Sequence, residues 1–150
     1  MIHIKTFLCI FFLSTIIFGS TKSYSQISAG NETNALQNIL HMQQSAWNNG
    51  NLDSFMLFYW NSPELRFVSK KGVNKGWQQV YDNYKKSYAG KSQMGILNFD
   101  IKSVELIDRK NALIIGSWEV KNDTGTHAGY FSLWFKKMNG NWVIVVDHTS

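Results

Sequence analysis

Residues 127–149 read HAGYFSLWFKKMNGNWVIVVDHT, and this stretch decides the fold class. Two long apolar segments, His127–Met138 and Trp142–Thr149, lie on either side of Asn139-Gly140. An Asn-Gly pair favours a two-residue hairpin turn because both of its residues accept a positive φ. We therefore predict two antiparallel strands joined by a tight turn.

Two further strands are predicted directly before this hairpin. Apolar residues alternate from Leu97 to Ile101 and resume in the opposite phase from Val104 to Leu106. A change of phase indicates an extra residue in the strand, so we expect a β-bulge near Lys102 or Ser103 that bends it. The segment from Ala112 to Lys121 predicts the next strand of the meander.

The first half of the chain predicts helices instead, because its apolar residues recur at helical spacing. Asn31 is a candidate N-cap for the first helix, and Gly50 follows its end. Helices followed by a meander of strands indicate an α+β fold, with three N-terminal helices packed on a strongly bent antiparallel sheet. The helices are expected at residues 31–49, about 52–60 and about 77–89, with a short strand at 65–69 and a turn at 70–76.

An export signal is expected at residues 1–25. A basic start with Lys5 precedes an almost uncharged apolar run from Phe7 to Phe18, and small polar residues lead to a cleavage site after Ser25. The run is shorter than the roughly 20 residues of a membrane span. We therefore expect a periplasmic or secreted protein with no stable membrane insertion after cleavage. An uncleaved anchor is the alternative.

Composition and charge exclude several functional classes. A chain of 150 residues with 44% hydrophobic and 17% charged residues predicts one compact domain. We assign residues 26–31 to a flexible lead-in and residues 32–150 to that domain. Removal of residues 1–25 lowers the formal net charge from +5 to +3 and removes Cys9, the only cysteine. A disulfide, a thiol nucleophile and a nucleic-acid partner are therefore not expected. No HExxH motif or helical histidine pair occurs, so neither a metal nor another cofactor is expected.

Several short motifs, in this order, resemble a known family. WNNGNLD at 47–53 joins the first two helices, Gly76-Trp77 opens the third, and the chain ends with NGNW at 139–142 and DHTS at 147–150. This set resembles the nuclear transport factor 2-like superfamily, in its SnoaL-like and ketosteroid-isomerase-like branch, and more narrowly the bacterial DUF4440-type families of unknown function. The resemblance covers residues 32–150. It implies a cone-shaped fold that encloses a pocket and dimerises through its sheet.

The same resemblance argues against steroid isomerisation by the family's mechanism. Its tyrosine on the first helix falls near Gln43, its catalytic aspartate falls near Phe67, and its second acid falls near Trp134 or Phe135. None of these positions holds an acid–base group. Any catalysis must therefore use other residues.

His148 and Asp147 are the candidate catalytic residues. An imidazole exchanges protons near neutral pH, and a carboxylate can orient it or act as a base. Neighbouring residues of a regular strand face opposite sides, so only one of the two can enter a pocket. Because His148 shares its face with Trp142, we predict that His148 points inward.

Aromatic and polar residues from several elements are candidates for lining the pocket. Arg66 lies in a short apolar strand, where it either binds an anionic ligand group or pairs with Asp53 or Glu64. The candidate ligand-binding residues are Gln43, Trp47, Tyr59, Trp60, Arg66, Ser69, Trp77, Tyr84 and Trp118. Aromatic residues at such spacing also build ordinary cores, so we expect about half of them to touch a cavity.

Large apolar residues on both faces of the strand at 127–138 favour a homodimer. Phe131 and its face can pack beneath the helices, while Tyr130 and Trp134 face the other side and can meet a second subunit. The hypothesis is an exported domain that binds a small, largely apolar molecule, with cofactor-free isomerase, dehydratase or cyclase chemistry as an open extension. The alternative is a non-catalytic dimeric protein-interaction module.

Overall fold

A computed structural model describes the backbone of residues 20–150 and the side chains from residue 29 onward. The expected signal at 1–25, with Cys9, lies outside the described residues apart from the backbone of 20–25. The elements are α1 (Ser20–Asn48), α2 (Leu52–Met56), β1 (Arg66–Ser69), β2 (Gly72–Lys75), α3 (Trp77–Ser87), α4 (Lys91–Met94), β3 (Ile96–Leu106), β4 (Asn111–Asn122), β5 (Gly125–Met138) and β6 (Asn141–Thr149). The predicted α+β fold is confirmed, with α4 as an additional short helix.

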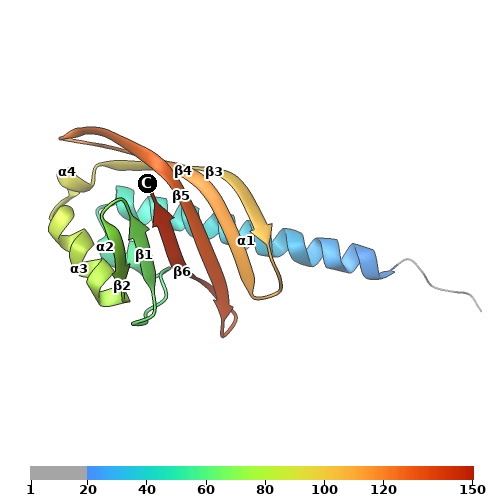
Figure 1. Cartoon of the computed structure of the whole chain (residues 1–150). Coiled ribbons are helices and arrows are strands. Elements are labelled where there is room, and N and C mark those ends of the chain that lie inside the picture. Colours follow the sequence, from blue (N-terminus) through green and yellow to red (C-terminus); the bar gives the residue numbers. More distant parts are fainter. Residues whose placement is uncertain (1–19) are drawn as a thin grey trace, which may run out of the picture.

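The strands form one curled sheet in the order β2-β1-β6-β5-β4-β3. Strands β3 to β6 form the predicted antiparallel meander. β1 pairs with β6 in parallel, so the sheet is mixed rather than purely antiparallel. The helices lie on the inner side of the curl, where α1 crosses β3, β4 and β5 (Figure 1).

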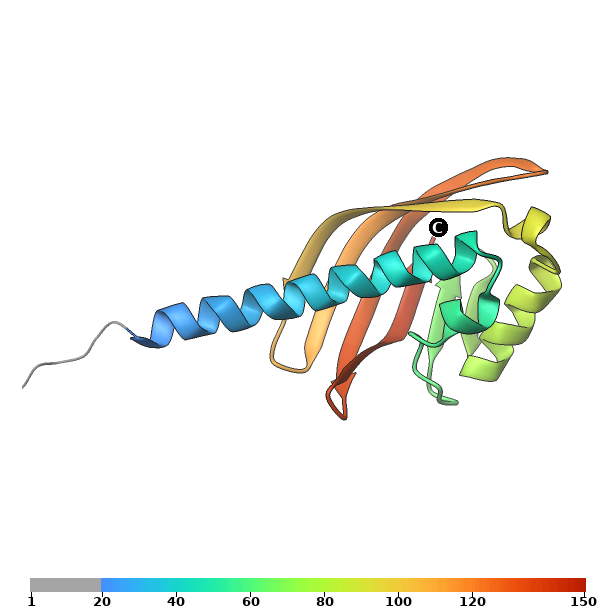
Figure 2. The ribbon, with the colours of Figure 1, turned by 180° about the vertical axis from the view of Figure 1, so that it is seen from behind.

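Helix α1 is longer than the sequence pattern predicts. Its described part starts at Ser20, so residues 26–31, the expected lead-in, are helical and Asn31 is not the N-cap. Gly30 is the least favourable residue for a helix in that stretch, and one glycine costs only about 1 kcal/mol relative to alanine. The first part of α1 extends beyond the sheet (Figure 2). No helix within residues 20–150 is both long enough and apolar enough to cross a membrane.

The second half of α1 forms hydrogen bonds with β3, which is an edge strand of the sheet. Leu36 and Leu40 are completely or almost completely buried, as the helical spacing predicts. Asn48 exchanges two hydrogen bonds with the backbone of Leu97 in β3, at 2.7 and 3.0 Å. Gln44 Oε1 accepts a third bond from the Phe99 amide at 2.7 Å. These side chains satisfy backbone groups that an edge strand otherwise leaves unpaired.

The chain after α2 differs from the sequence-based expectation. α2 ends at Met56, before the predicted end near Trp60, because the following residues pair with β6 instead. The Ile144 amide donates to the Phe58 carbonyl, and the Trp60 amide donates to the Ile144 carbonyl, both at 2.9 Å. This bridge places Tyr59 beside the last strand. The expected turn at 70–76 is a hairpin whose second half is β2.

Two bulges bend the sheet, and only the first was predicted. The register of β3 on β4 shifts between Ile101 and Ser103, which confirms the expected bulge. In β6, Ile144 pairs with Phe135 and Val146 pairs with Trp134. Val145 is therefore the extra residue, and the inward-facing phase of β6 changes there.

Candidate functional site

A cavity of about 810 Å³ lies between the helices and the inner face of the sheet. Its residues come from α1, α2, α3 and from all strands of the sheet, so segments far apart in sequence meet at one place. The aromatic part of the wall consists of Trp47, Phe55, Tyr59, Phe67, Tyr84, Tyr88, Phe99, Trp118 and Phe131. Such a wall suits an apolar ligand with a ring, and a few polar groups then set its orientation.

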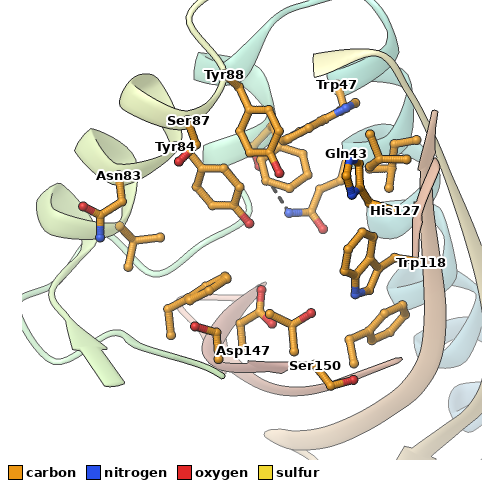
Figure 3. A pocket seen from close by; sticks show the side chains of 18 of the residues that line it. Gln43, Trp47, Asn83, Tyr84, Ser87, Tyr88, Trp118, His127, Asp147 and Ser150 are labelled. Atoms are coloured by element: carbon orange, nitrogen blue, oxygen red, sulfur yellow. Dashed lines mark hydrogen bonds between the residues drawn. The ribbon is translucent and has the colours of Figure 1, made fainter. Parts of the chain in front are cut away.

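The carboxyl group of Asp147 is the central polar group of this wall. Asp147 faces the cavity from β6 and is only 5% exposed (Figure 3). Tyr59 donates a hydrogen bond from its hydroxyl to Asp147 Oδ2 at 2.7 Å. No other described side chain donates a hydrogen bond to this carboxyl group. Its second oxygen therefore remains free for a ligand.

Burial makes the carboxyl group of Asp147 hold its proton more tightly than an ordinary aspartate does. Desolvation raises the pKa of Asp147 to about 6, and the hydrogen bond from Tyr59 partly opposes that rise. Burial also raises the pKa of Tyr59 and of Tyr84 well above the ordinary value, and the charge of Asp147 adds to both. Near neutral pH both phenols therefore stay protonated, while Asp147 is close enough to its pKa to gain or lose a proton.

Gln43 and Tyr84 complete the polar part of the wall. Gln43 lies on α1 and is 1% exposed, and its Nε2 donates to the Phe55 carbonyl at 3.2 Å. This bond holds the amide so that its oxygen has no protein donor among the described residues. Tyr84 projects from α3 across the cavity from Trp118 (Figure 3). A ligand in the cavity would contact the amide oxygen of Gln43 and the phenol of Tyr84.

Trp118 carries a polar atom whose hydrogen-bonding capacity is unused. Its Nε1 is completely shielded from solvent and has no hydrogen-bond partner among the described residues. Trp118 lies opposite Gly129 in the β4–β5 ladder, and a Cβ at Gly129 would lie 3.0 Å from this nitrogen. The same Cβ would overlap with the Ser150 carbonyl oxygen, so glycine at 129 makes room for the Ser150 backbone as well as for the indole. The indole N–H stays unsatisfied in the wall.

The rim of the cavity is basic. Lys70 and Lys71 come from the β1–β2 turn, and Lys86 comes from the last turn of α3. Between these two elements, Asn83 Nδ2 donates to Asn74 Oδ1 at 3.2 Å, which ties α3 to β2. Asp147 is the only acidic side chain in the lining.

The structure brings many of the predicted pocket residues together and leaves the others outside. Those that line the cavity are Gln43, Trp47, Tyr59, Ser69, Tyr84, Trp118 and Asp147. Trp77, Arg66, Trp60 and His148 do not line it. Trp77 donates from Nε1 to the Met56 carbonyl and stacks on Tyr81. Arg66 is exposed and lies 3.9 Å from Glu64, the pairing expected if it does not bind a ligand.

The prediction that His148 points inward is wrong, and the bulge at Val145 is the reason. Trp142 and Ile144 face the core, as expected. After Val145 the inward positions are Asp147 and Thr149, so His148 is exposed on the outer side, opposite Ser132. Asp147 thereby takes the place in the pocket that the sequence pattern assigned to its neighbour.

Several lining residues were not among the predicted candidates. Tyr88 follows directly after α3 and has the same helical spacing from Tyr84 as the apolar residues of the predicted helix at 77–89. Phe99 and Phe131 follow the alternation of their strands, so sequence signals for all three existed. Phe67, which falls near the catalytic aspartate of the family that the sequence resembles, also lines the cavity. Within residues 20–150, no three His, Cys, Asp or Glu side chains lie close enough together to hold a metal ion.

Similarity to known proteins lies mainly in the structure. No protein-family model matches the chain, and no curated protein matches it. A solved NTF-2 like protein of unknown function from Shewanella oneidensis is 34% identical over 79% of this chain and 98% of its own, with a TM-score of 0.77. Two more distant structures show the likeness of fold alone. A nuclear transport factor 2 superfamily protein from Salmonella enterica is 16% identical, with a TM-score of 0.64, over 81% of this chain and 92% of its own. A ketosteroid isomerase-like protein from Erwinia carotovora is 14% identical, with a TM-score of 0.63, over 79% and 95%.

Proposed function

The chain belongs to the nuclear transport factor 2-like superfamily, and from this premise we propose that its cavity binds a small, largely apolar molecule. The observation that carries the proposal is the buried Asp147–Tyr59 pair in the wall of a cavity of about 810 Å³. A buried carboxyl group costs stability, and a ligand-binding role explains why one is kept there. The narrower DUF4440-type assignment remains a prediction, since no family model matches.

The proposal extends to proton transfer without a cofactor, with Asp147 as the acid–base group. A carboxyl group with a pKa of about 6 can accept a proton from a weakly acidic C–H or O–H group of the ligand and return it at another position. Tyr59 orients the carboxyl group, and Tyr84 and Gln43 offer contacts for the ligand's own polar atoms. Isomerisation, dehydration and cyclisation all fit such a single acid–base group.

Binding is tested first by native mass spectrometry of the chain purified from an export-competent host. Denaturing analysis then identifies any small molecule that the protein releases. A defined compound bound to the wild type supports the proposal. An empty protein that also ignores a panel of apolar ring ketones and acids would contradict it and would favour the interaction module.

Proton transfer is tested with 2-tetralone, a ring ketone with exchangeable C–H groups next to its carbonyl. The protein is expected to accelerate deuterium uptake from heavy water, followed by NMR, and Asp147→Asn is expected to abolish the acceleration. His148→Asn is the matched control, since it alters the neighbouring residue on the outer side of the sheet. Equal exchange with wild type and Asp147→Asn would exclude Asp147 as the base.

Export and dimerisation belong to the same proposal. A chain whose mature N-terminus is Gln26, established by N-terminal sequencing, would support a cleaved signal at 1–25 and a periplasmic or secreted location. The outer face of the sheet exposes Ile115, Tyr130 and Trp134, which supports a homodimer through that face. The same exposed apolar residues are the observation that favours the second candidate function, a dimeric protein-interaction module.

A further inference from the structure

We propose that the ligand is an anionic amphiphile whose acidic group binds the lysine rim while its apolar body fills the cavity and its hydroxyl group reaches Asp147. This inference rests on the proposed binding function and adds the chemical class of the ligand. The lysine rim is defined here as Lys70, Lys71 and Lys86.

The charge of the cavity is arranged in two layers. The lysine rim is exposed, whereas Asp147, the only acidic side chain of the lining, is buried. None of the three lysines has a carboxylate within ion-pair distance in the described part of the chain. By contrast Lys75, just beyond the turn, pairs with Glu64 at 3.0 Å. The three lysines are therefore unpaired among the described residues, and their charge favours the approach of an anion to the entrance.

The rim is held in place by the fold. Lys70 and Lys71 lie in a two-residue turn in which the Lys71 amide donates to Ser69 Oγ at 3.2 Å. The Asn83–Asn74 hydrogen bond links this hairpin to α3, which carries Lys86. The lysines thus converge on one opening from two connected elements, and flexible ammonium groups can reach an acidic group there.

The inner end of the cavity fits a hydroxyl donor. Gln43 Oε1 and Asp147 Oδ1 accept no hydrogen bond from the described residues. The Gln43 side chain uses only its amide nitrogen, which donates to the Phe55 carbonyl. The Asp147 carboxyl group uses only Oδ2, which accepts from the Tyr59 hydroxyl. Two free acceptors in an aromatic wall favour an alcohol or phenol over a second acidic group, which the Asp147 charge would repel above its pKa.

Lys86 could act by stabilising the end of α3 instead of by binding a ligand, and its neighbour Lys85 allows the two roles to be distinguished. Cations in the last turn of a helix interact favourably with the helix dipole, and Lys85 and Lys86 both occupy that turn. Lys85 lies 5.1 Å from the centre of the Tyr81 ring and does not line the cavity. A purely helix-stabilising role predicts equal effects of the two lysines on ligand affinity.

The test compares two fluorescent ring probes that differ by one charge, 6-hydroxy-2-naphthoic acid and its methyl ester, titrated near neutral pH at low and high salt. The acid is expected to bind about tenfold more tightly than the ester at low salt, since exposed ion pairs each contribute about two- to fivefold. This preference is expected to fall at high salt, where surface charges are screened. The same loss is expected in Lys86→Gln and in the double variant Lys70→Gln/Lys71→Gln, but not in Lys85→Gln.

The outcomes separate the ligand class from the function itself. Equal affinities for acid and ester would overturn the anionic class and leave the binding function standing. Equal effects of Lys85→Gln and Lys86→Gln would also overturn it, because the helix end and not the rim would then set the affinity. Failure of acid, ester and the uncharged 2-naphthol to bind would overturn both proposals.

Discussion

Tyr59 and Asp147 form a buried hydrogen bond of 2.7 Å that joins the segment after α2 to the last strand. The parallel bridge between Tyr59 and Ile144 sets the distance, and the bulge at Val145 turns Asp147 toward the phenol. The pair therefore depends on two local irregularities of the backbone. Its protonation is coupled to folding, because burial changes the proton affinity of the carboxyl group.

Asp147→Asn is expected to remove a pH dependence of stability. The folded-state pKa is raised from 3.8 to about 6, so the folded protein binds this proton more tightly than the unfolded chain does. The resulting stabilisation is present below about pH 4 and is lost as the pH rises through 6, at a total cost on the order of 3 kcal/mol. The asparagine variant is uncharged and keeps an oxygen for the Tyr59 hydroxyl.

Urea unfolding at about pH 4 and about pH 8 measures this effect. The variant should match the wild type in the acidic buffer and exceed its free energy of unfolding by about 1 to 3 kcal/mol in the alkaline one. The pKa of Glu32 is lowered by its bonds to Lys137 and Trp142, but this contribution is common to both proteins and cancels in the difference. A constant difference at both pH values would show that the carboxyl group is not desolvated.

Tyr59→Phe is expected to raise the pKa of Asp147 above about 6. The phenol donates to the charged carboxylate and lowers its pKa, so its removal leaves only the effect of burial. Carbon-13 NMR of the aspartate carboxyl groups reports the titration directly. Tyr81→Phe is the control, because the Tyr81 hydroxyl binds the exposed Asp53 instead. An unchanged or lower Asp147 pKa in the Tyr59 variant would contradict the geometry.

Much of the fold was predictable because its signals are local. The alternation of the strands, the Asn139-Gly140 turn and the phase change near Lys102 each depend on a few neighbouring residues, and the structure confirms them. The parallel pairing of β1 with β6 was not predictable in this way, because it joins residues distant in the sequence. The start of α1 was missed since capping preferences indicate where a helix can begin, not where it must.

The site was only partly predictable, and the last strand shows why. Ile144, Val145 and Val146 are all apolar, so the alternation of apolar and polar residues is interrupted there and cannot reveal the bulge at Val145. Extending the alternation from Trp142 placed His148 inward and Asp147 outward. The true phase follows from the partner strand, since Leu133, which lines the cavity, lies opposite Asp147. Tertiary pairing thus decides which of two chemically reactive neighbours enters the pocket.

Trp47→Phe is expected to destabilise the protein more than Trp118→Phe. Trp47 donates from Nε1 to the buried Met94 carbonyl at 2.9 Å, so its removal leaves that carbonyl without a partner. Trp118 Nε1 has no partner to lose, and phenylalanine removes an unsatisfied donor. The difference in the free energy of unfolding should be about 2 kcal/mol by urea titration. Equal losses would mean that Trp118 Nε1 binds a group, such as a retained ligand, in the purified protein.

Trp134→Lys is expected to convert the proposed dimer into a monomer. Trp134 lies on the outer face of the sheet at 45% exposure, and its strand neighbour Tyr130 is 67% exposed on the same face. A charge in the middle of an apolar interface must be desolvated without a partner, which costs several kcal/mol. The monomer's own core is untouched because the side chain is already exposed.

Light scattering coupled to gel filtration measures the mass of the wild type and the variant across a range of concentrations. Leu57→Lys is the matched control, since Leu57 is 74% exposed but lies after α2, away from the outer face. A dimeric wild type, a monomeric Trp134→Lys and a dimeric Leu57→Lys support the sheet interface. A monomeric wild type at all concentrations, or a Trp134 variant that stays dimeric, would show that this face does not join two copies of the chain. Its exposed aromatic residues would then favour binding of a different partner protein.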